Sequence, residues 1–180
     1  LVCINDYSDF SGGVPSVCSD DRKAIRDAVD FLYGRGHRVI SLLITNMNTL
    51  NNLVRAGAFE EYTAGHGGRL RGSVIRTESR FLNAVPLERY VEKLPADCTA
   101  VIAPVEAFGN RLYKILKALR PEAALIPWCY LLHDYAAAAG IPFMRQDFRS
   151  LAETAVKMLQ DQLQGMPVSN SFVPYIFNRS

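Results

Sequence analysis

The 180-residue chain is 49% hydrophobic and 21% charged, with a net charge of +2 at pH 7, which is typical of a globular protein. A charge so close to zero provides no basic surface of the size that nucleic acid or an anionic membrane would need. We find no apolar run that could span a bilayer and no secretion signal. The four cysteines are widely spaced, which favours reduced thiols in a cytoplasmic protein over disulfides or zinc.

The first residues, 1–5, predict a buried strand. A loop rich in serine, glycine and aspartate follows at 6–13, and a short apolar piece at 14–17 leads into the next helix. Because the sequence starts inside a strand-like run, we expect the chain to be a fragment of a longer protein.

Residues 22–43 predict a helix, a glycine turn and a strand in direct succession, which is half of a parallel β-α-β unit. Asp20 and Asp21 are suited to cap the helix, and the glycines at 34–36 are suited to end it. The strand at 39–43 is almost continuously apolar, as expected where helices cover both faces of a sheet. The helix positions that should face inward are Ile25, Ala28, Val29 and Leu32.

Helices and strands alternate through the rest of the chain. Further helices are expected at 49–63, at 81–94 with a start near Pro86, and at 106–119, 133–139 and 148–163. Further strands are expected at 72–76, 99–103, 123–128, 141–144 and 171–177. Two helices should bury one face each, with the inward positions Phe108, Leu112, Ile115 and Leu119, and Leu151, Ala155, Met158, Leu159 and Leu163. This alternation predicts an α/β fold, a Rossmann-like three-layer sandwich around a parallel sheet.

Ligands of open α/β sheets bind beyond the carboxyl ends of the strands. The strand ends expected here carry amide, guanidinium, carboxylate and aromatic groups, which could orient a polar small molecule. None carries a glycine-rich phosphate loop or a Walker lysine. The candidate positions are Asn5, 44–48, Arg76, 103–106, 128–130 and 145–148.

Several segments in a fixed order identify a family resemblance. They are VPSVCSDDRKAIRDAVDFLYGRGHRVISLL (14–43), RAGAFEEY (55–62), CTAVIAP (98–104), MRQDFRSLAETAVKMLQDQLQG (144–165) and VPYIFNRS (173–180). Together they resemble the effector-binding domain of the LacI/GalR family of bacterial transcription regulators. The helix-GHR-strand segment and QDFRSLAETAV are the most specific parts, whereas 69–94 matches poorly.

The resemblance implies a periplasmic-binding-protein-like fold of type I, in which three crossover strands join two lobes around a small-molecule effector. Residues 18–142 would form a complete C-terminal lobe, and 1–17 with 143–180 an incomplete N-terminal lobe with its crossovers. The resemblance also implies a homodimer, with the helix at 106–119 and residues 62–70 as possible interface elements. Operator DNA would be contacted only by a helix-turn-helix domain absent from this chain. No membrane partner, cofactor, metal or enzymatic activity is implied.

The resemblance also nominates site residues. Arg55 would clamp ligand hydroxyls or carboxylates, although a solvated helix arginine is the alternative. Gln146 would reach the ligand and Phe148 would wall the pocket, while Asp147 would cap the following helix. Asn5 ends the first strand, where a hinge or ligand contact is implied.

Two departures concern the polar contacts that the family makes to sugars. Val105 and Glu106 replace an asparagine-aspartate pair, and Pro127, Trp128 and Cys129 replace a glycine, an aromatic residue and an aspartate. Each lost charged hydrogen bond is worth roughly 1.5–3 kcal/mol. Either the effector is a more apolar or cationic molecule read by Glu106 and Trp128, or the pocket has lost ligand binding. Trp128 is equally suited to the core.

Two other classes of protein remain as alternatives. A solute-binding protein of a sugar transporter shares the two-lobed architecture, but no secretion signal is seen. An enzyme or nucleotide-binding Rossmann domain is opposed by the missing phosphate loop and by the lack of any HExxH, CxxC or nucleophile-elbow motif. Cys129, near His133 and Asp134, could be imagined as a nucleophile, but a small buried cysteine is the commoner case.

Overall fold

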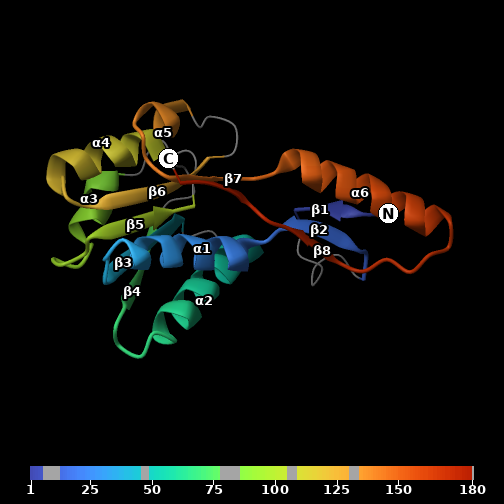
Figure 1. Ribbon diagram of the computed structural model, residues 1–180, viewed down its shortest axis with the longest axis horizontal. Helices are drawn as coiled ribbons and strands as arrows, with labels where there is room; N and C mark the ends of the chain where they lie inside the picture. Colours follow the sequence, from blue (N-terminus) through green and yellow to red (C-terminus); the bar gives the residue numbers. More distant parts are fainter. Residues whose placement is uncertain (6–12, 46–48, 78–85, 105–108, 130–133, 180) are drawn as a thin grey trace.

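A computed structural model describes residues 1–5, 13–45, 49–77, 86–104, 109–129 and 134–179. The chain forms two lobes drawn out along one axis (Figure 1). The large lobe is built on a six-stranded sheet and the small lobe on a three-stranded sheet. Both lobes combine strands with helices, so the predicted α/β class is confirmed.

The six-stranded sheet has the order β4-β3-β5-β6-β7-β9. Its strands run parallel except β9, which pairs antiparallel to β7. The strands are β3 (Val39–Thr45), β4 (Arg71–Thr77), β5 (Ala100–Ala103), β6 (Ala124–Cys129), β7 (Phe143–Arg145) and β9 (Ile176–Asn178). The helices of this lobe are α1 (Asp21–Gly34), α2 (Leu50–Ala64), α3 (Leu87–Glu92), α4 (Gly109–Leu119) and α5 (Asp134–Ala138).

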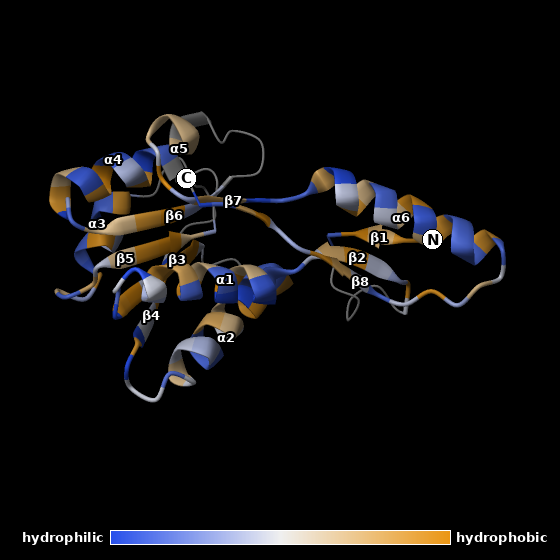
Figure 2. Cartoon of the chain, viewed as in Figure 1, coloured by the Kyte–Doolittle hydropathy of each residue, from blue (hydrophilic) through white to orange (hydrophobic). Residues whose placement is uncertain are grey.

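Alternate residues of the central strands enter two separate cores. Ile40 and Leu42 of β3 pack with α1 and α2 on one face of the sheet. Leu43 of β3 and Val101 of β5 pack with α3 and α4 on the other face. Strands β5 and β6 are mainly hydrophobic, whereas the outer surface of α1 is mainly hydrophilic (Figure 2). The large lobe is therefore the predicted three-layer sandwich.

The small lobe pairs strands from the two ends of the chain. Its sheet has the order β1-β2-β8, all parallel, with β1 (Cys3–Ile4), β2 (Ser16–Ser19) and β8 (Ser171–Val173). Helix α6 (Phe148–Leu163) covers this sheet, and its core consists of Val17, Leu151, Ala155, Met158 and Val173. Among the described residues, no helix is long and apolar enough to cross a membrane.

Side-chain caps fix the starts of the main helices. Lys23 N donates to Asp20 Oδ1 at 2.8 Å at the start of α1, and Ser150 N donates to Asp147 Oδ1 at 3.0 Å at the start of α6. The predicted capping roles of Asp20 and Asp147 are thus confirmed. The bond from Ser150 N and a second one, from Ser150 Oγ to Asp147 Oδ2 at 2.8 Å, hold the pKa of Asp147 below its usual value. Gly36, at φ 94°, takes the left-handed conformation that ends the α1 segment.

Four sequence predictions are wrong in detail. The expected strand 171–177 is two strands, because Pro174 has no N–H to donate and the chain leaves the small sheet there for the large one. The first strand is not buried, since Ile4 is 55% exposed. Leu119 is 48% exposed because it is the last residue of α4. Leu159 and Leu163 are 43% and 82% exposed, since a three-stranded sheet covers only a narrow stripe of α6. Phe108 lies outside the described residues.

Gly72→Ala is expected to lower the free energy of unfolding by about 1–3 kcal/mol, the usual effect of overpacking. A methyl group at Gly72 of β4 would lie 2.5 Å from Thr63 Oγ1 and 2.9 Å from Phe59 Cε1, on the helix that covers this strand. Gly57→Ala is the matched control, because no atom lies within 4 Å of its added methyl group. Alanine in a helix should stabilise by about 0.5–1 kcal/mol. Urea unfolding of both variants tests this, and equal stabilities would contradict it.

Candidate functional site

The chain passes between the lobes at three places, which lie together at the junction of the two sheets (Figure 1). The first passage runs from β2 into α1, the second from β7 into α6, and the third from β8 into β9. Polar side chains of all three passages meet at this junction. It is also where the resemblance placed a binding site.

Arg55 of α2 is the central cation of the junction. Its Nε donates to Asp21 Oδ1 at 2.9 Å, and the side chains of the pair are 7% and 0% exposed. Its Nη1 donates to the carbonyl oxygen of Pro104 at 3.4 Å. The guanidinium carbon lies 4.6 Å from the ring centroid of Trp128. Arg55 is therefore not a solvated helix arginine.

Tyr175 links the third passage to this ion pair. Its hydroxyl donates to Asp21 Oδ1 at 2.8 Å and accepts from Arg55 Nη2 at 3.3 Å and from Gln146 Nε2 at 3.4 Å. A phenolic oxygen has one proton and two lone pairs, so these three bonds use its full capacity. The Tyr175 ring lies tilted against Trp128, with the centroids 4.5 Å apart.

Gln146 extends the network into the small lobe. Its Nε2 donates to Ser19 Oγ at 2.8 Å, and the residue is 5% exposed. Ser19 in turn donates through its N and Oγ to Asn5 Oδ1, at 3.3 and 3.4 Å. Asn5 has a left-handed backbone with φ 56°, which asparagine tolerates better than most residues. We call this hydrogen-bonded set the junction network: Asn5, Ser19, Asp21, Arg55, Gln146 and Tyr175.

Trp128, at the end of β6, is fully buried against the junction network. Its indole Nε1 has no hydrogen-bond partner among the described residues, and the same holds for Thr77 Oγ1 at the end of β4. Leaving a buried donor unpaired costs roughly 1–3 kcal/mol. Both atoms lie at carboxyl ends of parallel strands, where α/β sheets bind ligands.

Solved structures with this architecture are found in several bacteria. A LacI family transcriptional regulator from Bifidobacterium animalis subsp. lactis DSM 10140 matches 98% of this chain, with a TM-score of 0.79 and 21% identity. A LacI regulator from a Rhodococcus species matches 99%, also with a TM-score of 0.79 and 21% identity. A periplasmic binding protein/LacI regulator from Alkaliphilus metalliredigens QYMF, complexed with D-xylulofuranose, matches 98% with a TM-score of 0.74 and 15% identity.

The chain has the LacI-type core fold. It covers 66%, 67% and 68% of these three chains, so it spans about two thirds of their length. No protein-family model and no curated protein sequence matches it. The predicted periplasmic-binding-protein-like architecture is therefore confirmed by structural similarity.

The LacI-type fold brings four of the six nominated site residues together. Asn5, Arg55 and Gln146 belong to the junction network, and Trp128 packs against it. Phe148 begins α6 and is 44% exposed, and its side chain has no polar atom that could join the hydrogen-bonded network. Glu106 lies outside the described residues, as do Val105 and the side chain of Cys129.

Sequence reasoning missed three members of the junction network. Asp21 was expected only to serve the start of α1, yet its carboxylate pairs with Arg55, 34 positions later. Ser19 ends a short strand without any motif of its own. Tyr175 was assigned to the middle of a strand, although the proline before it signalled a break.

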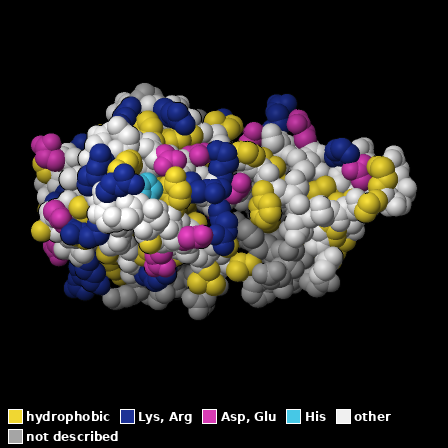
Figure 3. All heavy atoms as spheres, turned by 60° about the horizontal axis from the view of Figure 1, so that its bottom comes forward, with side chains coloured by type: hydrophobic (Ala, Val, Ile, Leu, Met, Phe, Trp, Pro, Cys, Tyr) yellow, Lys and Arg dark blue, Asp and Glu magenta, His cyan; other side chains and the backbone are white. Residues whose placement is uncertain are grey.

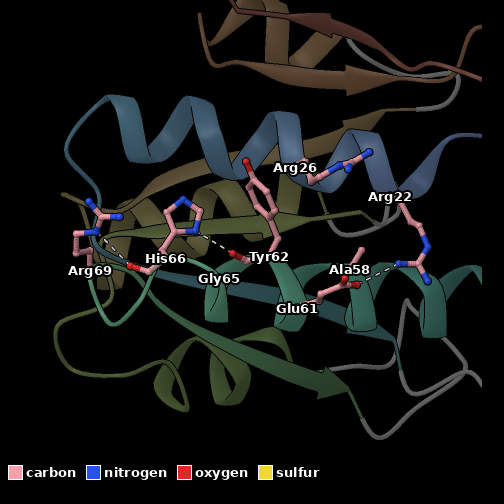
Figure 4. A pocket seen from close by; sticks show the side chains of 8 residues that line it. All are labelled: Arg22, Arg26, Ala58, Glu61, Tyr62, Gly65, His66 and Arg69. Carbon is pink, nitrogen blue, oxygen red and sulfur yellow. Dashed lines mark hydrogen bonds and ion pairs between the residues drawn. The ribbon is translucent and has the colours of Figure 1, made fainter.

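A groove of about 600 Å³ lies elsewhere, on the outside of the large lobe between α1 and α2 (Figure 4). The polar side chains that line this groove mainly form ion pairs and hydrogen bonds with neighbouring residues of the protein. Arg22 pairs with Glu61 at 3.3 Å, and His66 Nδ1 lies 2.8 Å from the carbonyl oxygen of Tyr62. The ion-paired side chains are 60% and 78% exposed, and charges of both signs are interspersed over this lobe (Figure 3). Exposed ion pairs of this kind contribute little interaction energy, so the buried junction is the stronger candidate for a ligand-binding site.

The junction is not a metal site in the part of the chain that the structure describes, since no three His, Cys, Asp or Glu side chains gather there or elsewhere. In the described residues of the junction, amide, indole and phenol groups surround the neutralised Asp21–Arg55 ion pair, an arrangement that could hold a small polar molecule.

Proposed function

We propose that the chain is the ligand-sensing part of a LacI-type bacterial transcription regulator. A small-molecule effector would bind between the two lobes, next to the junction network, and control operator binding by a separate helix-turn-helix domain. The observation that carries this proposal is the junction network itself, in which buried polar side chains from both lobes and from all three passages meet.

The network also provides a means of response. A ligand shifts a conformational equilibrium only by its difference in affinity for the two states. Rotation of one lobe against the other would change the distances among Ser19, Gln146 and Tyr175, which come from three different passages. A ligand that bonds to these groups in one arrangement only would therefore select that arrangement.

We also propose that the regulator acts as a homodimer, because two-fold operators require two copies of the DNA-binding domain. The exposed end of α4 around Leu119 supports the predicted interface in this region. The D-xylulofuranose of the Alkaliphilus protein belongs to that protein. By the family resemblance, Val105 and Cys129 of this chain stand where the family has polar residues that contact sugars, so the effector has to be found by experiment.

The test is a thermal-shift screen of the full-length gene product against sugars, polyols, sugar phosphates, nucleobases, amino acids and polyamines. A ligand at 100 times its Kd should stabilise the folded state by about 2.7 kcal/mol. Tyr175→Phe, which removes the shared hydroxyl, should weaken the response. Arg22→Ala, in an exposed ion pair of the same lobe, should leave it unchanged. A protein that melts cooperatively and responds to no class of compound would contradict the proposal.

A further inference from the structure

We propose, on the basis of the function proposed above, that Asp21 is a built-in counter-anion that makes the junction reject charged ligands. The effector is then an uncharged polar molecule. Arg55 is the group that would ordinarily attract a carboxylate or phosphate, and Asp21 already occupies that position.

All three nitrogens of the Arg55 guanidinium are engaged inside the protein. Nε bonds to Asp21, Nη1 to the Pro104 carbonyl and Nη2 to the Tyr175 hydroxyl. One face of the group also lies over Trp128, 4.6 Å from the ring centroid. These bonds use three of the five N–H groups of Arg55, and the side chain is only 7% exposed, so an incoming anion would meet a cation whose charge Asp21 already balances.

Asp21 cannot move aside into water. The residue is 0% exposed, and its Oδ1 accepts from both Arg55 and Tyr175 while its Oδ2 accepts from Asn51 Nδ2 at 3.4 Å. It is also the first residue of α1, where the helix dipole favours negative charge. An anion at Arg55 would leave this buried carboxylate without its counter-ion, or place two negative groups on one cation.

The groups that the described residues leave for a ligand are all neutral. Among the described residues, Asn5 Nδ2, Gln146 Oε1 and Trp128 Nε1 have no hydrogen-bond partner. Two of them donate and one accepts, which is the complement of hydroxyl, carbonyl or amide groups. Within the described part of the chain, a cationic ligand finds no free carboxylate there, because the carboxylate of Asp21 is held by Arg55 and Tyr175.

Asp21→Asn in the full-length gene product tests the assignment, with inorganic phosphate as the probe and chloride at equal ionic strength as the reference. Asparagine keeps the shape and leaves Arg55 without its counter-ion. Phosphate should bind the variant in a saturable way and stabilise it. The affinity of the variant for phosphate should be at least about tenfold higher than that of the wild type. Trp128 is the only tryptophan of these 180 residues, so a phosphate-dependent change in fluorescence that disappears when Trp128→Phe is added reports binding at this site. Glu61→Gln, which removes a carboxylate beside an exposed arginine, should gain nothing.

Two results would overturn the assignment: saturable binding of phosphate by the wild type with a change in Trp128 fluorescence, or no gain in Asp21→Asn. Asp21→Ser, a smaller neutral residue that suits a helix start, replaces the asparagine variant if that variant does not fold. If neither variant folds, the wild-type arm decides alone. An anionic effector found in the screen would contradict this assignment and leave the proposed function standing. If Asp21→Asn gains phosphate binding but the screen finds no effector, the assignment of Asp21 stands and the proposed function fails.

Discussion

Arg55→Met and Asp21→Asn are each expected to lower the free energy of unfolding by about 3–5 kcal/mol, because each leaves the other charge buried without its counter-ion. The pair is joined at 2.9 Å with side chains 7% and 0% exposed, so neither charge can be solvated by water instead. The double variant should lose much less than the sum of the two single changes, since it removes both charges together. Urea unfolding of the four proteins gives this coupling energy directly.

The exposed Arg22–Glu61 pair is the matched control for that cycle. Its side chains are 60% and 78% exposed, so Arg22→Met and Glu61→Gln should each change stability by less than about 1 kcal/mol. If the losses at Arg55 and Asp21 simply add, the two charges do not stabilise each other. In that case the ion pair is not the centre of the junction.

Trp128→Ala should lower the free energy of unfolding by about 3–5 kcal/mol, as large-to-small changes of buried aromatic residues do. The side chain is fully buried and packs on Tyr175 and Arg55, so the vacated space lies at the centre of the junction. Trp128→Phe should lose far less stability, because it keeps an aromatic ring and removes an N–H that has no partner among the described residues.

Thermal and urea unfolding of the two Trp128 variants separate packing from hydrogen bonding. If phenylalanine is as destabilising as alanine, the indole N–H makes a bond that stabilises the fold. If phenylalanine is stable but fails to respond to an effector, the N–H serves the ligand. The second result is the one that we expect.

Local sequence patterns predicted the helices and strands whose capping residues and apolar spacing lie within the segment itself. Helix α6 begins and ends where the sequence indicated, at Phe148 and Leu163, because Asp147 caps it and apolar residues recur at helical spacing. The same spacing did not reveal that Leu159 and Leu163 remain exposed. Periodicity identifies an apolar stripe, but the width of the sheet beneath it decides how much of that stripe is covered.

The candidate site was predicted in part, for a similar reason. Arg55 and Gln146 lie in segments that resemble a known family, and the structure places them in one network. Their partners Asp21 and Tyr175 were missed because their roles depend on contacts 34 and 120 positions away from Arg55. Spacing along the chain carries no information about such pairs, whereas the topology of the two sheets determines them.

The Tyr175 hydroxyl has a mechanical consequence. One oxygen atom bonds to Asp21 from the first passage, to Gln146 from the second and to Arg55 from the body of the large lobe, while its own residue lies on the third passage. No strand of the connection can bend alone without breaking a bond to that atom. The lobes are therefore expected to change their angle in one concerted step between two arrangements, and intermediate angles should be sparsely populated.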